Sequence, residues 1–437
     1  MRDGLIELGE MSRASGVPIA GARREVPYRV LLGVLSLVLV VLLGGGPHRR
    51  PQEPPTVIPA RLGDATFIDG DRLFVVSAGR PALRSDMQNR VVSAYTLPEG
   101  RLASRTTVAV SGAGVAQVVQ AADTLLLSYQ LDNRSEWGDS GTWAVVAITV
   151  GTDRALWRKA GRLVGASAAD GLVVLNSDGA ELGVDLHTGE IRWSVPHPAD
   201  GFTAEAGAVG GFPSWLVTVT DVGRLETRDP RTGRVHAAVT VPRLTGRATG
   251  LVWPVGDLFL IDAGASRFEA FRLPDLTPLW HTSADLSQSR SQADCGRVLC
   301  TFRPQRGMTA LDPATGRELW SSDRWAYAEA AGPYLLATSG DPADDLPALS
   351  VLDPVTGREL GNFGVWQLLG RSGRDGTAYG IWQVPGESKI YYGALNPATR
   401  GVRVLGSGQQ VSTGCDIGAG VLVCRLIDAS IAVWRLG

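Results

Sequence analysis

From about residue 61 onward, apolar and polar positions alternate in short runs that are separated by turn residues. The runs LFVV (73–76), LVVL (172–175) and LFLI (258–261) are apolar throughout, and each follows a turn that contains Asp-Gly or Gly-Asp. Short runs bounded by such turns are typical of β-strands, and a strand buried on both faces is continuously apolar. No helical periodicity of useful length follows residue 60, so the pattern predicts an all-β body.

One hairpin recurs along this body, and its clearest copy is MTALDPATGRELW at residues 308–320. Pro313 presets φ for the second position of a turn, Asp312 can accept backbone N–H groups just ahead of it, and Gly316 can adopt positive φ. The copies repeat at spacings of 36 to 53 residues. A period near 40–45 with four strands per unit predicts propeller blades. The residues aligned with Gly316 are Gly100, Asp153, Gly189, Gly233, Leu276, Gly357 and Arg400.

Each unit is expected to contain an inner strand, an apolar second strand, a third strand that ends at the turn, and an outer strand. The segment 410–437 supplies only three strands, and residues 56–62 (TVIPARL) are expected to supply the fourth and to close the ring. Eight hairpins and this composite unit count to nine, whereas one misread unit near residues 100–150 would leave eight. We predict an all-β propeller of about eight four-stranded blades, with nine as the alternative.

The ALDPxTGxxLW hairpin resembles the tryptophan-docking repeat of PQQ-like β-propellers, a family that includes quinoprotein alcohol dehydrogenases and the propeller lipoprotein of the outer-membrane β-barrel assembly machinery. The resemblance covers about residues 61–437. It implies that the tryptophans at the motif's last position pack between neighbouring blades, namely Trp157, Trp193, Trp280 and Trp320. It implies weaker or different docking where Ser104, Ala237, Gly361 and Val404 replace them. Because the repeat is structural, it implies a fold and not an activity.

The stretch 30–46, VLLGVLSLVLVVLLGGG, carries no charge. Seventeen helical residues cover about 26 Å, the short end of a bilayer crossing. We predict a cytoplasmic tail over 1–28, an uncleaved signal anchor over 29–46, a Pro-rich linker over 47–60 and an extracytoplasmic propeller over 61–437. A cleaved signal peptide is the alternative. The predicted location is the cell membrane, single-pass, with the N-terminus in the cytoplasm because Arg23, Arg24 and Arg29 precede the span.

Composition narrows the classes of function. With 44% hydrophobic and 20% charged residues, the 437-residue chain can bury a large core and is not of the disordered type. The net charge of −2 gives no overall basic field, which argues against a nucleic-acid partner. We predict a monomer.

The four cysteines form two local pairs in sequence, Cys295 with Cys300 and Cys415 with Cys424. Both separations are odd, as directly opposed residues around an even-length hairpin loop require. We predict two disulfides, which suit an oxidising exterior, from three possible connectivities. Metal binding is the alternative, although the sequence contains no CxxC and no nearby histidine.

Quinone catalysis is the sharpest enzymatic hypothesis that the resemblance raises. Family quinoproteins use a vicinal cysteine pair, a calcium site and a catalytic aspartate. This chain has no adjacent cysteines, and no positions match the calcium ligands or the base. We therefore predict no catalytic, metal-ligating or cofactor-binding residues and no cofactor.

Four links between second and third strands are long, namely 77–90, 131–141, 340–348 and 383–389. They belong to the first two and last two hairpin units, which ring closure brings together. We expect a partner-binding lip there, because binding residues concentrate on loops, while a tolerated insertion is the alternative. The predicted lip residues are Arg84, Arg90, Glu136, Trp137 and Asp139.

The sequence thus predicts a membrane-anchored extracytoplasmic propeller, attached through residues 30–46, that binds or scaffolds an envelope protein, a peptide or a glycan. The alternative is a quinoprotein-type dehydrogenase or another propeller enzyme.

Overall fold

All 36 elements in the described part of the chain are β-strands, and they form nine antiparallel sheets of four strands each. The computed structural model describes residues 53–79, 87–110, 114–131, 143–199, 201–209, 211–220, 222–241, 252–262, 268–282, 284, 286, 289, 291–303, 307–339, 348–372 and 377–437. These belong to one compact unit, Glu53–Gly437. The predicted tail and span and residues 47–52 of the predicted linker lie outside the described residues, which contain no helix long and apolar enough to cross a membrane.

The nine sheets are numbered here as blades 1 to 9, and each is given from its inner to its outer strand. Blade 1 contains β2 (Ala65–Asp69), β3 (Arg72–Val76), β4 (Gln88–Thr96) and β5 (Leu102–Val110). Blade 2 contains β6 (Gly114–Ala121), β7 (Thr124–Gln130), β8 (Trp143–Thr149) and β9 (Ala155–Ala160). Blade 3 contains β10 (Arg162–Ser167), β11 (Leu172–Ser177), β12 (Ala180–Asp185) and β13 (Ile191–Pro196).

Blade 4 contains β14 (Phe202–Val209), β15 (Phe212–Val219), β16 (Arg224–Arg228) and β17 (Val235–Thr240). Blade 5 contains β18 (Val252–Val255), β19 (Leu258–Asp262), β20 (Phe268–Arg272) and β21 (Thr277–Thr282). Blade 6 contains β22 (Ser291–Asp294), β23 (Leu299–Phe302), β24 (Met308–Leu311) and β25 (Glu318–Ser322).

Blade 7 contains β26 (Trp325–Ala331), β27 (Tyr334–Ser339), β28 (Leu349–Leu352) and β29 (Glu359–Asn362). Blade 8 contains β30 (Gln367–Ser372), β31 (Thr377–Gln383), β32 (Lys389–Asn396) and β33 (Gly401–Gln409). Blade 9 contains β34 (Val411–Gly418), β35 (Val421–Leu426), β36 (Ile431–Arg435) and, as its outer strand, β1 (Thr56–Ile58).

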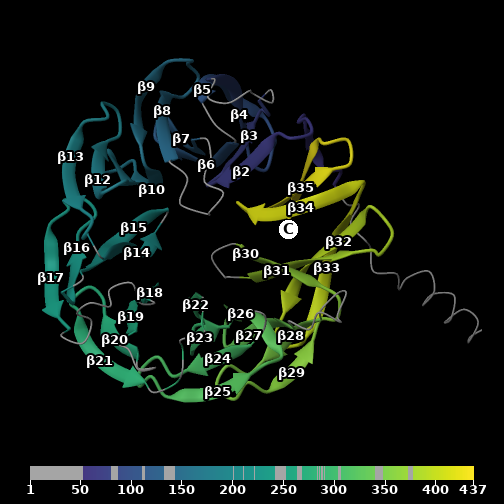
Figure 1. Cartoon of the computed structure of the whole chain (residues 1–437). Coiled ribbons are helices and arrows are strands. Elements are labelled where there is room, and N and C mark those ends of the chain that lie inside the picture. The colour runs from purple at the N-terminus through teal and green to yellow at the C-terminus, as the bar shows by residue number, and fades with distance from the viewer. Residues whose placement is uncertain are drawn as a thin grey trace, which may run out of the picture. The chain divides into compact units, whose positions relative to one another are not determined.

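The blades stand side by side around a central axis, so the yellow C-terminal blade lies next to the first one (Figure 1). β1 pairs antiparallel with β36, with Thr56 opposite Val433 and Ile58 opposite Ile431. The prediction that residues 56–62 supply the closing strand is therefore confirmed. The preferred count of eight is wrong. The stretch near residues 100–150 that raised doubt contributes the outer strand of blade 1 and most of the complete blade 2.

Burial follows the order of strands within a blade. In blade 6, for example, all four residues of β23 and of β24 are buried, whereas the outer strand β25 is exposed or half-buried. The middle strands are apolar on both faces because each blade packs against a neighbour on either side. The core is correspondingly divided into separate apolar clusters, several of which combine residues of adjacent blades.

The Asp-Pro turn is built as its sequence predicts. Oδ1 of Asp312 accepts the N–H of Ala314 at 2.9 Å, Oδ2 accepts the hydroxyl of Thr315 at 2.8 Å, and Gly316 adopts φ +70°. These bonds favour the ionised carboxylate, so the backbone N–H of Ala314, followed by the hydroxyl of Thr315, lowers the pKa of Asp312.

Four outer strands each carry one tryptophan that contacts the turn of the next blade. The indole N–H of Trp320, in blade 6, donates to the carbonyl of Pro354 at 2.8 Å, and its ring covers Gly357 in the turn of blade 7. An added Cβ at Gly357 would lie 2.5 Å from Cδ2 of the indole. The same arrangement joins Trp157 to Gly189, Trp193 to Gly233 and Trp280 to Gly316. The turn glycine therefore also provides room for the indole.

Where the tryptophan is replaced, the residue at the facing turn is replaced as well. Gly361 takes the tryptophan's place in blade 7, and Arg400 takes the glycine's place in blade 8. The side chain of Arg400 covers Gly361 and donates to the carbonyl of Leu360 at 2.8 Å. Likewise Ala237 in blade 4 faces the turn of Leu276, which is 2% exposed and belongs to the apolar cluster against which Ala237 packs. At these two junctions, a side chain of the turn therefore fills the space between the blades that a tryptophan of the outer strand fills elsewhere.

Candidate functional site

The two faces of the propeller differ in the connections that they carry. Turns between first and second strands and between third and fourth strands form what we call the turn face. Links between second and third strands, and links from one blade to the next, form the loop face. The four long links belong to blades 7, 8, 1 and 2, which are consecutive around the ring except for blade 9 between them.

Most of the predicted lip lies outside the described residues, namely Arg84, Glu136, Trp137 and Asp139. Arg90 is described and lies at the base of its link. Its Nη1 donates to the carbonyl of Ser77 at 3.2 Å, and its partial burial lowers its pKa. The hydroxyl of Ser77 accepts the N–H of Val91 at 2.7 Å. Arg90 therefore holds the two ends of the link 77–90 together.

Arg425 holds the loop face together at the point of ring closure. Its Nη1 donates to the carbonyls of Arg61 and Ala429, and its Nη2 donates to the carbonyl of Asp64. These bonds join the link between β1 and β2 to the turn between β35 and β36. Leu62, which is 88% exposed, projects from the link, and Ile427, which is 60% exposed, projects from the turn. The clamp therefore presents two aliphatic side chains to solvent.

An aromatic pair lies in blade 8, on the side of the blade that packs against blade 7. The rings of Trp382 and Tyr391 stack with centroids 5.3 Å apart, and the ammonium of Lys389 lies 4.8 Å from the centroid of Tyr391. Both rings are half-buried at the ends of the strands that flank the link 383–389. This arrangement offers a partner a flat apolar surface with one cation.

A buried carboxyl group lies on the same face at blade 3. Glu181 is 0% exposed, its Oε1 accepts the side-chain amide of Asn176, and it lies 3.4 Å from Nε2 of His197. Burial, reinforced by the charge of Glu205, raises the pKa of Glu181 to about 7, and burial lowers the pKa of His197. Glu205 itself pairs with Arg162 at 2.7 Å. The sequence contains no motif that links Glu181 with His197, so neither residue was among the predicted site residues.

Replacing Glu181 with glutamine should change how stability depends on pH. The folded protein holds a proton on Glu181 up to about pH 7, whereas the unfolded chain releases it near pH 4.5. Stability from this group therefore falls as pH rises from 4.5 to 7, by on the order of 3 kcal/mol. Glu181→Gln cannot ionise, so urea unfolding should show its stability rising relative to wild type across this interval. Parallel curves for the two proteins would contradict the assignment.

The central channel contains a cavity of about 450 Å³. Its walls come from the inner strands of blades 9, 1 and 2, with Asp69, Gln117 and Asp416 among polar residues and Phe67 among the apolar ones. Gly211, at the tip of the long first hairpin of blade 4, closes another side. This tip crosses the inner strand of blade 3 at Gly165, where a Cβ would collide with the carbonyl of Gly211.

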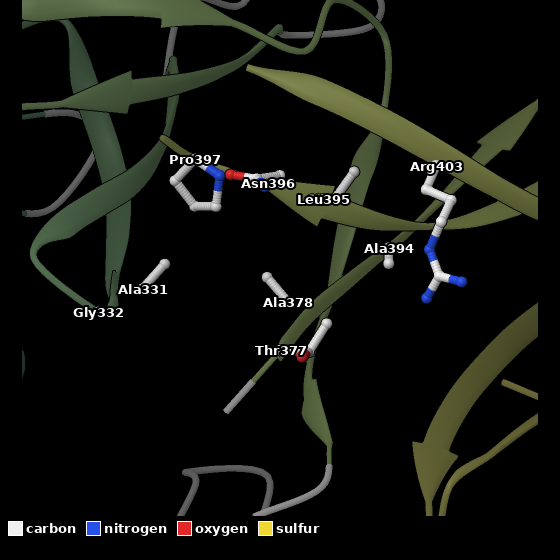
Figure 2. A pocket seen from close by; sticks show the side chains of 9 residues that line it. All are labelled: Ala331, Gly332, Thr377, Ala378, Ala394, Leu395, Asn396, Pro397 and Arg403. Carbon is white, nitrogen blue, oxygen red and sulfur yellow. The ribbon is translucent and has the colours of Figure 1, made fainter. Parts of the chain in front are cut away.

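A second cavity, of about 390 Å³, opens between blades 7 and 8 near the turn face (Figure 2). Ala331, Ala378 and Leu395 form its apolar part, and Asn396 and Arg403 stand at its rim. The described residues offer no group of three or more His, Cys, Asp or Glu side chains able to hold a metal ion.

Both predicted cysteine pairs lie at disulfide distance, with S–S separations of 2.01 Å for Cys295–Cys300 and 2.10 Å for Cys415–Cys424. Cys415 and Cys424 are directly opposed in the ladder, as predicted. Cys300 instead pairs with Ala293, so Cys295 lies beyond the ladder in the turn. The pairing is therefore confirmed, although direct opposition holds for only one of the two disulfides.

Comparison with known proteins adds structural likenesses only. No family model and no curated protein matches the sequence. Among solved structures, BamB from Moraxella catarrhalis is similar over 88% of this chain and 97% of its own, with 14% identity and a TM-score of 0.43. The designed protein Ika8 is similar over 75% of this chain and 99% of its own, with 15% identity and a TM-score of 0.42. The dihydro-heme d1 dehydrogenase NirN is similar over 75% of this chain and 83% of its own, with 15% identity and a TM-score of 0.38.

Proposed function

We propose that this protein is a non-catalytic binding module, anchored in the cell membrane, whose loop face captures a protein of the cell envelope. The observation that carries the proposal is the clamp of Arg425, which fixes exposed Leu62 and Ile427 between the blades that bear the long links. Exposed aliphatic side chains held on ordered backbone are favourable contact points for another protein. The predicted lip residues around Trp137 belong to the same proposed surface.

A protein suits this surface better than a glycan does. Leu62 and Ile427 offer aliphatic area with no hydrogen-bonding group, so the hydroxyls of a sugar would lose water there without gaining a partner. Trp382 and Tyr391 add aromatic area, which is enriched at the centre of protein interfaces. An extended peptide or a glycan is therefore the less favoured occupant.

The membrane anchor and the extracytoplasmic location are part of the proposal and rest on the sequence. The uncharged stretch 30–46 supports the anchor. The two cysteine pairs at disulfide distance support an oxidising compartment.

A photo-crosslinking amino acid at Leu62 or Ile427, in the full-length protein in intact cells, should trap one and the same partner. The matched control is Val355, an aliphatic residue that is 39% exposed on the turn face of blade 7. Leu62→Asp with Ile427→Asp should then weaken binding of the purified partner at least tenfold, which corresponds to about 1.4 kcal/mol. Equal trapping from Val355, or trapping of a glycan alone, would refute the proposal.

The rival proposal is an enzyme, either a quinoprotein-type dehydrogenase or another propeller enzyme. The observation in its favour is the Glu181–His197 pair, because adjacent groups with displaced pKa values cluster at catalytic sites. Against it, Glu181 is fully buried, so a substrate could reach its carboxyl group only after the surrounding strands move.

A further inference from the structure

The two disulfides differ in how far a reagent in solution can approach them. Cys295 and Cys300 are 1% and 0% exposed and belong to an apolar cluster shared by blades 6 and 7. Sγ of Cys295 faces the carbonyl of Ala328 in blade 7 at 3.8 Å. In the second disulfide, Cys424 is 1% exposed, but Cys415 is half-buried on the inner strand of blade 9. Only the second disulfide has a sulfur-bearing residue in partial contact with solvent.

The backbone before Cys415 is also irregular. The ladder between β34 and β35 shifts its register twice, between Val411 and Thr413 and again between Thr413 and Cys415. Gly414 adopts φ +66°, and no atom lies within 4 Å of where its Cβ would be. Bulges leave residues unpaired and weaken the ladder locally. The strand can therefore move next to Cys415 without breaking a regular ladder.

A cavity of about 160 Å³ adjoins this disulfide from the side of blade 1. Its lining includes Gly414, Asp416, Cys424 and Arg425. Gly414 and Asp416, on either side of Cys415, therefore border open space on the side of blade 1. Cys424 belongs to an apolar cluster between blades 8 and 9, as Cys295 and Cys300 belong to one between blades 6 and 7, so the difference in access rests on the half-buried Cys415.

We propose that Cys415–Cys424 is a thiol–disulfide exchange site whose reaction partner is a dithiol. A thiolate of the dithiol attacks Sγ of Cys415, a new S–S bond forms there, and the old bond breaks with its electron pair leaving on Sγ of Cys424. Water protonates this thiolate. The second thiolate of the dithiol then attacks the first sulfur of the same reagent and releases Cys415 as a thiolate. Two electrons pass to the protein, and the dithiol becomes a disulfide.

Exchange at this position acts on the wall of the channel cavity. Asp416 follows Cys415 directly and lines both the channel cavity and the smaller one. Beyond it the ladder is regular, with Asp416 opposite Val423 and Gly418 opposite Val421. Reduction therefore frees the bulged segment 411–415 while blade 9 keeps its remaining pairs.

Timed reduction of the full-length native protein tests the proposal, with the other disulfide as an internal control. Dithiothreitol is added without denaturant, thiols are blocked with iodoacetamide, and peptides are mapped by mass spectrometry. Cys415–Cys424 should open at least tenfold faster than Cys295–Cys300, because a sealed disulfide needs local opening first. Equal rates, or faster opening of Cys295–Cys300, would overturn the proposal.

A monothiol tests the direction of attack. Glutathione, added under the same native conditions, should form its mixed disulfide on Cys415, the half-buried member of the pair. An adduct on Cys424 would overturn the assignment of Cys415 as the attacked sulfur. Neither measurement needs a variant, so a failure to fold cannot obscure the result.

Discussion

Replacing Gly357 with alanine should destabilise the propeller by about 3 kcal/mol. Part of this loss is the cost of positive φ, which for alanine amounts to about 1 to 2 kcal/mol. The rest comes from overpacking, since the new Cβ would lie 2.5 Å from the indole of Trp320 and force it from its place. Urea or thermal unfolding of the full-length protein would measure the difference.

Gly332 provides the matched control in the same blade. Its φ is +60°, close to the +67° of Gly357, but nothing lies within 4 Å of where its Cβ would be. Gly332→Ala should therefore cost only the conformational part, about 1 to 2 kcal/mol. Equal losses at the two glycines would show that the indole is not what constrains Gly357.

The junction at which Ala237 faces Leu276 suggests a further test of this explanation with a compensating pair of substitutions. Trp320→Ala combined with Gly357→Leu would reproduce the native pair of Ala237 and Leu276. The double variant should be less destabilised than the sum of its single variants by at least about 1 kcal/mol, because the leucine fills the space that the indole leaves. Strict additivity would contradict the view that outer strand and turn share one space.

Replacing Ile58 with aspartate should open the ring. Ile58 is 0% exposed and lies in an apolar cluster with Leu73 of blade 1 and Val421 of blade 9, so the variant buries an unpaired carboxylate at the closure. We expect a loss of more than about 4 kcal/mol together with rapid proteolysis of blade 9. Denaturant unfolding and limited proteolysis would measure both effects.

A substitution at the neighbouring Val57 distinguishes the effect of side-chain burial from the effect of backbone pairing in β1. Val57 lies in the same three-residue strand but is 54% exposed. Val57→Asp should therefore cost less than about 1 kcal/mol. If it were as damaging as Ile58→Asp, the closing strand would depend on its backbone and not on the side chain that it buries.

What could be predicted from the sequence was local. The roles of Asp312 and Gly316 follow from the turn itself, and the closing strand follows from a unit that lacked one strand. The preference for eight blades rested on the number usual in the family that the hairpin resembles and on an irregular unit near residues 100–150, where Asp153 replaces the turn glycine and the hairpin lies 53 residues after the first. That irregularity suggested a misread unit, whereas the structure contains a complete blade.

What could not be predicted depends on contacts between separate segments. Glu181 and His197 meet because β12 and β13 pair antiparallel, with Ala180 opposite Pro196, and nothing in either segment alone indicates it. The exchange of roles between Gly361 and Arg400 was present in the sequence as two departures from the repeat. Pairing them requires knowing that each turn faces the outer strand of the preceding blade. Whether the chain carries PQQ-like repeats in the family sense stays a prediction.

The closing strand also determines how the propeller would respond to mechanical load. β1 and β36 are antiparallel, so residue 53 and the C-terminal Gly437 leave the sheet at the same end. A force that pulls these two ends apart opens the pairs one after another, beginning with Thr56 and Val433, and never loads all of them at once. Because β1 has only three residues, such a zipper offers little resistance. Tension along the chain would therefore separate this strand before it disturbed any other blade.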